Sequence, residues 1–301
     1  MRAFVTGASG FVGHWLIEHL RAMGDEVSAP EVEITDAELV RDALAAAQPQ
    51  AVYHLAAIAN VGESWGAPQQ TFAVNAAGTL NLLEAARALA ATPRVLLVCS
   101  AEVYGRVAPA DLPLREDAPL RPVSPYAASK VAAEFLGMQA HLAYGLPVIR
   151  ARAFNHIGPG QAPTFVVSSL ARQVAEVARR GGGAIHVGNL TPQRDFTDVR
   201  DVVRAYRLLM ERGVPGDVYN VCSGEAIAIA ELADRLVRLA GVDVSIEVDA
   251  DRVRAVDVPI LLGDPGRLVA ATGWQREWSL DDTLVDVLDS WRSELAGSPP
   301  R

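Results

Sequence analysis

The chain has 301 residues, of which half are hydrophobic and 21% are charged, so it has ample apolar material for a core and is not expected to be disordered. Its formal net charge of −9 argues against nucleic acid or an anionic membrane as the main partner, and no apolar run reaches the length of a membrane span. Cys99 and Cys222 exclude a disulfide framework and have no metal-ligand spacing. The N-terminus has no signal-peptide layout, so we expect a cytoplasmic protein without a metal site.

Short apolar runs alternate with helical stretches through the first half of the chain. The predicted strands are Arg2–Thr6, Glu26–Ala29, Ala51–Leu55, Arg94–Cys99 and Pro147–Arg152. The predicted helices are Phe11–Met23, Asp36–Ala47, Thr71–Ala90 and Pro125–Tyr144. Such alternation predicts a doubly wound parallel sheet that is covered by helices on both faces.

The second half is less regular. We predict helices at Val166–Arg179, Asp201–Arg212, Ile229–Ala240 and Leu280–Leu295, and strands at Ile185–Val187, Val218–Val221 and Val244–Val248. The expected organisation is therefore an α/β domain over residues 1–160 and a smaller, mixed α/β lobe over residues 161–301. Parts of 190–220 are expected to return to the first sheet.

Three glycines, Gly7, Gly10 and Gly13, lie between the first strand and the first helix. Glycines here permit a tight turn and let the backbone approach a pyrophosphate, which then lies on the helix N-terminus. The first gap is two residues, where the usual dinucleotide fingerprint has one, and a turn that binds nothing is the alternative. Its place at the start of an alternating β/α pattern favours dinucleotide binding.

Tyr126 and Lys130 form a Tyr-x-x-x-Lys pair, and Lys130 is the sole lysine of the chain. Ser124 is a plausible N-cap and Pro125 suits the first helical position, so the pair, four residues apart, lies on one helix face. A free phenol titrates near ~10, and a neighbouring ammonium favours the phenolate. The spacing therefore predicts that Tyr126 is an acid/base group tuned by Lys130.

With these motifs, His54-Leu55-Ala56-Ala57 and the run from Val74 to Glu84 on the long helix resemble the extended short-chain dehydrogenase/reductase family, also called the NAD-dependent epimerase/dehydratase family. The resemblance covers nearly the whole chain. It implies a Rossmann domain that binds NAD or NADP, a nucleotide-sugar lobe, and a homodimer through the helices near Thr71–Ala90 and Pro125–Tyr144. The cofactor residues that it implies are Gly7, Gly10, Phe11, Val12, Gly13, Glu33, Ile34, Leu55, Ala56, Ala57, Asn75, Tyr126 and Lys130.

Two departures leave the choice between NAD and NADP open. NAD users commonly have an acid after the second strand and NADP users an arginine, whereas Val27–Pro30 contains neither. Glu33 stands where the family has an aspartate that contacts adenine, and it retains the ability to accept a hydrogen bond there.

The resemblance adds two catalytic candidates after the fourth strand. Ser100 lies four residues before Tyr104-Gly105, the family's position for a hydroxyl that would donate to the reacting sugar oxygen together with Tyr126. Glu102 occupies the position at which sugar-nucleotide 4,6-dehydratases have a glutamate that abstracts the C5 proton. Reductases of the neighbouring group often keep an acid there as well, so Glu102 permits dehydration without requiring it.

Three residues of the second half are candidates for substrate binding. The resemblance implies that Asn155 contacts the diphosphate-sugar, whereas His156 beside it is expected to be structural. Arg194 and Arg254 are candidate phosphate clamps, and two arginines on one diphosphate would offset the negative charge of the chain.

Within the family, these stretches most resemble GDP-4-keto-6-deoxy-D-mannose reductases of the GDP-mannose 4,6-dehydratase group. The dehydratases typically have Glu-Ser-Pro-Arg-Arg after Asn-His, where this chain has Ile157–Gln161. The expected reaction is hydride transfer from NAD(P)H to the C4 ketone of a GDP-linked 4-keto-6-deoxyhexose, giving GDP-D-rhamnose or its C4 epimer. A 4,6-dehydratase or 4-epimerase with tightly bound NAD(P) is the first alternative, and a non-catalytic dinucleotide-sensing protein is the second.

Overall fold

The computed structural model describes residues 1–249 and 258–297, and its larger part is built on a six-stranded parallel sheet. The strands are β1 (Arg2–Thr6), β2 (Glu26–Ser28), β3 (Ala51–His54), β4 (Arg94–Ser100), β5 (Val148–Ala153) and β9 (Val218–Val221). Their order is β2-β1-β3-β4-β5-β9, so the direction of winding reverses between β1 and β3. Ligands of such sheets bind in the crevice at this reversal, beyond the carboxyl ends of the strands. The predicted doubly wound sheet is confirmed.

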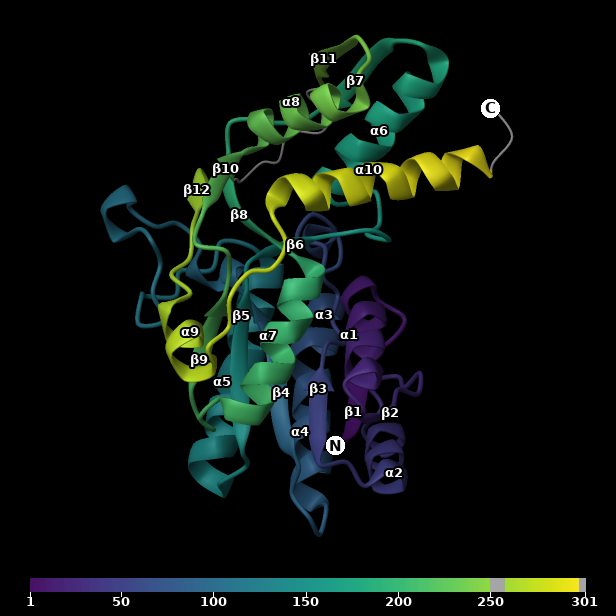
Figure 1. Ribbon diagram of the computed structural model, residues 1–301. Coiled ribbons are helices and arrows are strands. Elements are labelled where there is room, and N and C mark those ends of the chain that lie inside the picture. Colours follow the sequence, from purple (N-terminus) through teal and green to yellow (C-terminus); the bar gives the residue numbers. More distant parts are fainter. Residues whose placement is uncertain (250–257, 298–301) are drawn as a thin grey trace.

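Helices cover both faces of this sheet. One layer contains α1 (Phe11–Ala22), α7 (Val199–Arg212) and α9 (Gly266–Thr272), and it faces the viewer in Figure 1. The other layer contains α2 (Ala37–Ala47), α4 (Gly78–Ala88) and α5 (Pro125–Tyr144). Because side chains alternate along a strand, Val5 of β1 packs in the first layer's core and Phe4 in the second's.

The long helix predicted over Thr71–Ala90 is interrupted. The chain forms α3 (Pro68–Phe72), a π-helical turn η2 (Ala73–Ala77) and then α4. Single π turns inside helices occur frequently at functional sites. Gly78, the first residue of α4, packs so closely on Ile34 that a Cβ at this position would overlap the isoleucine side chain.

Short turns complete the first part of the chain. The 3₁₀ turns are η1 (Glu63–Trp65), η3 (Ala101–Tyr104) and η4 (Pro109–Asp111). Of these, η3 follows β4 directly and carries two of the predicted catalytic residues, Ser100 as its N-cap and Glu102 inside it.

The second part is a lobe beyond the carboxyl ends of the parallel strands, drawn at the top of Figure 1. A second sheet joins β6 (Asn155–Ile157), β8 (Gln193–Asp198), β10 (Ala226–Ala228) and β12 (Ile260–Leu261), and a separate pair joins β7 (Gly183–Val187) and β11 (Val244–Val248). The helices are α6 (Val166–Arg180), α8 (Ile229–Ala240) and α10 (Leu280–Ala296), which enclose an apolar core that contains Leu170, Leu232 and Trp291. Although α7, β9 and α9 come late in the sequence, they pack on the first sheet.

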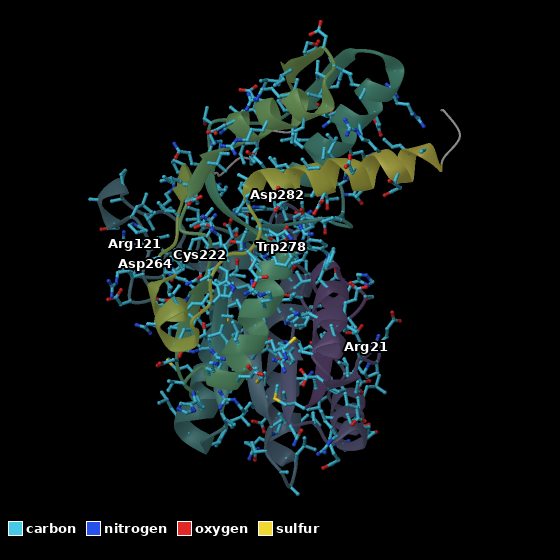
Figure 2. The ribbon with its side chains drawn as sticks, viewed as in Figure 1. Arg21, Arg121, Cys222, Asp264, Trp278 and Asp282 are labelled. Carbon is cyan, nitrogen blue, oxygen red and sulfur yellow. The ribbon has the colours of Figure 1, made fainter. Side chains whose placement is uncertain are left out.

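Buried aspartates of β8 and α7 join the two parts. Asp198 accepts hydrogen bonds from Arg200 and from Oγ1 of Thr283 on α10, and Asp201 accepts from the backbone N–H groups of Glu277 and Trp278. Figure 2 shows Trp278 and Asp282 at this junction, where the chain enters α10. These acids therefore attach α10 to the sheet domain. No helix within the described residues is long and apolar enough to cross a membrane.

Candidate active site

A cavity of about 1000 Å³ lies between the carboxyl ends of the parallel strands and the lobe. The predicted site residues that line it are Gly7, Gly10, Phe11, Val12, Gly13, Leu55, Ala56, Ala57, Ser100, Glu102, Tyr126, Lys130, Asn155 and Arg194. They come from both halves of the chain. The fold therefore brings the glycine turn, the Tyr-Lys pair and two of the substrate candidates into one space.

The glycine turn leaves the N-terminus of α1 open. Gly10 is the N-cap and has no capping side chain, and the first turn of α1 contains no acid. Gly7 has φ +69°, which favours glycine, and a Cβ at Gly13 would overlap the carbonyl oxygen of Gly7. The unpaired N–H groups and the helix dipole make this end a suitable site for a phosphate.

His54 at the end of β3 does not line the cavity, but its hydrogen bond to Thr6 supports the loop that does. Its Nδ1 lies 2.8 Å from Oγ1 of Thr6 and its Nε2 lies 3.0 Å from Oγ1 of Thr79. Since the Thr79 hydroxyl already donates to the Asn75 carbonyl, the imidazole donates from Nε2 and accepts at Nδ1. Burial lowers the pKa of His54 to about 3 and keeps the ring neutral. The same Thr6 oxygen accepts from the N–H groups of Leu55 and Ala56, which fixes the loop that lines the cavity.

Asn75 does not line the cavity either, but it holds the loop after β3 in place. Its side chain accepts from the Ile58 N–H at 2.8 Å and donates to the Ile58 carbonyl at 3.1 Å and to Oγ of Ser129 at 2.9 Å. Ser129 in turn donates to the carbonyl of Tyr126. Asn75, held in the π turn, therefore ties the loop after β3 to the first turn of α5.

Tyr126 is buried at the start of α5 and shares a hydrogen bond with Ser100 at the end of β4. Burial raises the pKa of Tyr126 to about 12, partly opposed by the hydrogen bond with Ser100. The phenol is therefore protonated at neutral pH and able to donate a proton. Ser100 also accepts from the Glu102 N–H at 3.2 Å as the cap of η3, which fixes its hydroxyl at the cavity.

Lys130 lies on the same face of α5 as Tyr126 and also lines the cavity. Its Nζ donates to the Val98 carbonyl of β4 at 2.9 Å. Burial lowers the pKa of Lys130 itself. The four-residue spacing predicted a common helix face correctly, but it did not specify which group the ammonium contacts.

The lobe side of the cavity carries polar groups. Arg194 of β8 is 9% exposed and donates to the Gln193 carbonyl, while Asn155 donates a long 3.4 Å hydrogen bond to the Asp195 carbonyl. His156 also lines the cavity, stacked on Phe11 with ring centroids 6.3 Å apart. Its Nδ1 must donate to the Phe154 carbonyl at 3.1 Å, and burial lowers its pKa, so its Nε2 is an acceptor.

Three predicted cofactor residues do not line the cavity. Ile34 is a core residue, Asn75 has the role described above, and Glu33 is exposed and accepts hydrogen bonds from the N–H and hydroxyl of Thr35. Those hydrogen bonds lower the pKa of Glu33. Arg254 lies outside the described residues. Within residues 1–249 and 258–297, no group of three or more His, Cys, Asp or Glu side chains is arranged to hold a metal ion.

The sequence matches the family model described as "GDP-mannose 4,6 dehydratase" over residues 27–287. The chain belongs to this family of extended short-chain dehydrogenases/reductases. It is 40% identical to the GDP-6-deoxy-D-mannose reductase of Pseudomonas aeruginosa, and the alignment covers 98% of each chain. It is 27% identical to a GDP-mannose 4,6-dehydratase of Vibrio cholerae over 96% of this chain and 92% of the relative.

Solved structures of the family share the whole fold. The structure of RMD from Pseudomonas aeruginosa complexed with NADPH has a TM-score of 0.89 and 38% identity, over 97% of this chain and 99% of the other. The UDP-glucose 4-epimerase of Thermus thermophilus in complex with NAD has a TM-score of 0.87 and 30% identity, also over 97% and 99%. The family contains reductases, dehydratases and epimerases, so the reaction must be argued from the site.

Proposed function

We propose that this chain is an NAD(P)H-dependent 4-ketoreductase that acts on a GDP-linked 4-keto-6-deoxyhexose. The observation that carries the proposal is that Tyr126 of α5 and Ser100 of β4 line one cavity with the open N-terminus of α1. The 40% identity to a GDP-6-deoxy-D-mannose reductase along the whole chain supports the same reaction and substrate class.

The glycine turn fits the pyrophosphate of a dinucleotide. Gly7 and Gly13 allow the tight packing of this turn, because a Cβ at either position would overlap backbone atoms of Ala56 or Gly7, and the N–H groups of the first turn of α1 are free to donate. Lys130 and Tyr126 lie farther along the same cavity, where the nicotinamide half would be held. Either NADH or NADPH is compatible, since Ser28–Pro30 contains neither an acid nor an arginine.

When bound, the reduced nicotinamide supplies the hydride. The oxygen of the C4 ketone then needs a proton, and Tyr126 is the group that holds one in the cavity at neutral pH. Ser100 donates a hydrogen bond to the same oxygen, which stabilises the negative charge that develops there. The reductive direction requires the acid form of the phenol, which is the form present at neutral pH.

The lobe would hold the nucleotide-sugar, which gives residues 161–301, apart from the elements that return to the sheet, the role of a substrate lobe. Arg194 is nearly buried at the cavity wall and can pair with the diphosphate, with Asn155 beside it. We assign Arg254 the role of second clamp on the resemblance alone.

One observation favours a second candidate, a 4,6-dehydratase or 4-epimerase with retained NAD(P). Glu102 lines the same cavity as Tyr126 and is held on η3 next to Ser100, as a proton-abstracting carboxylate would be. The variant Glu102→Gln separates the two. In a reductase, it should keep the rate of ketone reduction within about tenfold of the wild-type rate. A dehydratase would lose its base, and its rate would fall by about 10²–10⁴-fold.

The decisive experiment supplies purified protein with NADH or NADPH, and with GDP-mannose or GDP-4-keto-6-deoxymannose. Coenzyme oxidation that requires the keto sugar and is stoichiometric with product would support the reductase and reveal the preferred coenzyme. Conversion of GDP-mannose to a keto sugar without net coenzyme change would replace it with the dehydratase.

We also propose that two copies associate in the cytoplasm through α4 and α5. These helices lie side by side and expose Leu80, Phe135, Leu142 and Tyr144, with Leu142 74% exposed. Large exposed apolar side chains on two neighbouring helices support an interface at these helices. Light scattering should give the mass of a dimer, and Phe135→Glu should give a monomer that is still folded. A monomeric wild-type protein at micromolar concentration would contradict the proposal.

A further inference from the structure

A buried ionic network, centred on Glu134 of α5, lies outside the cavity lining. Its side chain is 0% exposed, and both carboxylate oxygens accept from Arg152 of β5, from Nε at 2.9 Å and from Nη2 at 2.6 Å. Nη1 of Arg150 lies 3.6 Å from Oε1. One fully buried carboxylate therefore faces two guanidinium groups.

The network continues from Arg152 to the turn after β4. Nη1 of Arg152 donates to Oη of Tyr104 and to the Glu116 carbonyl, each at 2.9 Å, and its guanidinium lies over the Tyr104 ring at 4.9 Å. The Tyr104 hydroxyl donates to Oδ1 of Asn220 at 2.6 Å. Tyr104 is thus held by its hydroxyl and by its ring.

The two ends of this network carry the proposed reacting groups. Glu134 follows Tyr126 and Lys130 at intervals of four residues, so the three lie along one side of α5. Tyr104 is the last residue of η3, whose N-cap is Ser100 and whose second residue is Glu102. Through Arg152 of β5, the network therefore connects the helix that holds Tyr126 with the turn that holds Ser100.

Stability alone does not account for a buried network of this kind. Desolvation of the charges offsets much of their attraction, and apolar residues of similar volume are often as stable. A fully satisfied polar network does, however, specify one arrangement of the elements that it joins. Hydrogen-bond distances around a reacting atom must hold within a fraction of an ångström, and a misplacement of 1 Å costs about 10²-fold in rate.

We infer that Glu134, Arg152 and Tyr104 are positioning residues for the reaction, because they set the placement of Tyr126 on α5 relative to Ser100 at the start of η3. The inference rests on the proposed ketoreductase activity for its kinetic consequences, but the placement of α5 has a readout of its own. Lys130 lies one helical turn before Glu134 and is the sole lysine, so its chemical reactivity reports on this face of α5 without any substrate.

The test compares Tyr104→Phe, Glu134→Gln and their double variant with Tyr219→Phe as the control. Tyr219 is also buried, and its hydroxyl accepts one hydrogen bond from the Val214 N–H, outside the network. We expect Tyr104→Phe to lower kcat about tenfold and Glu134→Gln about 10²-fold, with the KM for coenzyme within about twofold. The fold-decrease in kcat of the double variant should be smaller than the product of the fold-decreases of the two single variants, since both residues act through one network. Tyr219→Phe should lower the melting temperature and leave kcat unchanged.

A second measurement follows the rate at which a small acylating reagent modifies Lys130, read by peptide mass spectrometry. Tyr104→Phe and Glu134→Gln should change this rate at least threefold, and Tyr219→Phe should not. If Glu134→Gln does not fold, Tyr104→Phe alone decides. Unchanged kcat and unchanged labelling in Tyr104→Phe would overturn the inference. Changed labelling in a protein that reduces no keto sugar would overturn the proposed substrate instead and leave the positioning role standing.

Discussion

Lys130 of α5 donates a 2.9 Å hydrogen bond from Nζ to the Val98 carbonyl of β4, two residues before Ser100. The sole lysine of the chain is therefore attached to the strand that carries the proposed oxyanion donor. This contact fixes the position of the ammonium at the cavity wall.

Lys130 should be unusually reactive for a lysine. Burial lowers its pKa, so the neutral amine is more abundant at pH 8–9 than for an exposed lysine. The other amine, at Met1, is held by Asp25 at 2.6 Å. Treatment with a small acylating reagent should modify Lys130 faster than a lysine in a model peptide, and NADPH should protect it. Equal rates with and without coenzyme would contradict the placement of Lys130 in the coenzyme site.

Tyr126→Phe should lower kcat for ketone reduction by about 10²–10⁴-fold, because the cavity loses its proton donor. Coenzyme binding, followed by fluorescence titration, should be retained. In the wild type, a phenol with a pKa of about 12 remains protonated through pH 6–9, so kcat should not fall over this range through titration of Tyr126. The matched control is Tyr144→Phe, an exposed tyrosine at the end of the same helix, and equal losses in both variants would remove Tyr126 from the mechanism.

The glycine turn allows a graded test. Gly13→Ala places a methyl group on the carbonyl oxygen of Gly7 and should abolish coenzyme binding or prevent folding. Gly10→Ala brings a Cβ to 3.2 Å of the same oxygen, which a shift of a few tenths of an ångström relieves, and should weaken binding only several-fold. Calorimetric titration with NADPH and NADH measures both. Tight binding by Gly13→Ala would show that the pyrophosphate does not approach this turn.

Arg194→Gln should raise the KM for the GDP-linked sugar by about tenfold or more, since a charge-assisted hydrogen bond to phosphate is worth roughly 1.5–3 kcal/mol. The affinity for coenzyme should not change. Arg172→Gln is the control, because Arg172 lies on α6 in an ion pair with Glu176 and outside the cavity lining. A raised KM in both variants would point to a loss of global charge rather than to a specific clamp.

Acid should destabilise the protein in part through His54. Its pKa is lowered from 6.5 to about 3, so between these values the unfolded chain binds a proton that the folded chain does not. The contribution of neutral His54 is therefore complete above pH ~6.5 and falls by at most about 1.4 kcal/mol per pH unit below it. The free energy of unfolding, measured with urea at several pH values between 4.5 and 7, should fall less steeply with decreasing pH in His54→Gln than in the wild type. His14→Gln, at an exposed residue of α1, should keep the wild-type slope, and identical slopes in all three would contradict the buried neutral imidazole.

Elements with local signals were predicted to the residue. Ser124, whose Oγ accepts from the Ala127 N–H, and Pro125 begin α5, and Gly145 with φ +70° ends it. The predicted bounds of β1, β9, α8 and β11 are likewise confirmed. In each case the apolar period or the cap residues lie within the element itself.

The four strands of the second sheet, β6, β8, β10 and β12, were not predicted. β8 consists of Gln-Arg-Asp-Phe-Thr-Asp, so its sequence lacks the apolar pattern of a buried strand, although its side chains are nearly all buried. The three strands that pair with β8, which are β6, β10 and β12, are segments of two or three residues from distant parts of the chain. The π turn η2 was not predicted either, because the sequence from Thr71 to Ala90 has the pattern of one regular helix. The hydrogen bonds of Asn75 to Ile58 and Ser129 accompany this turn.

By itself, the sequence determined the parallel α/β fold, the glycine turn and the helix with Tyr126 and Lys130, because these depend on periodicity, caps and spacing over a few residues. Only the tertiary structure decided that Lys130 contacts Val98, that burial raises the pKa of Tyr126, and that Glu134 and Arg152 join α5 to the turn after β4. The physical reason is that desolvation and hydrogen bonding at these groups depend on segments far apart in the chain, which no local pattern brings together.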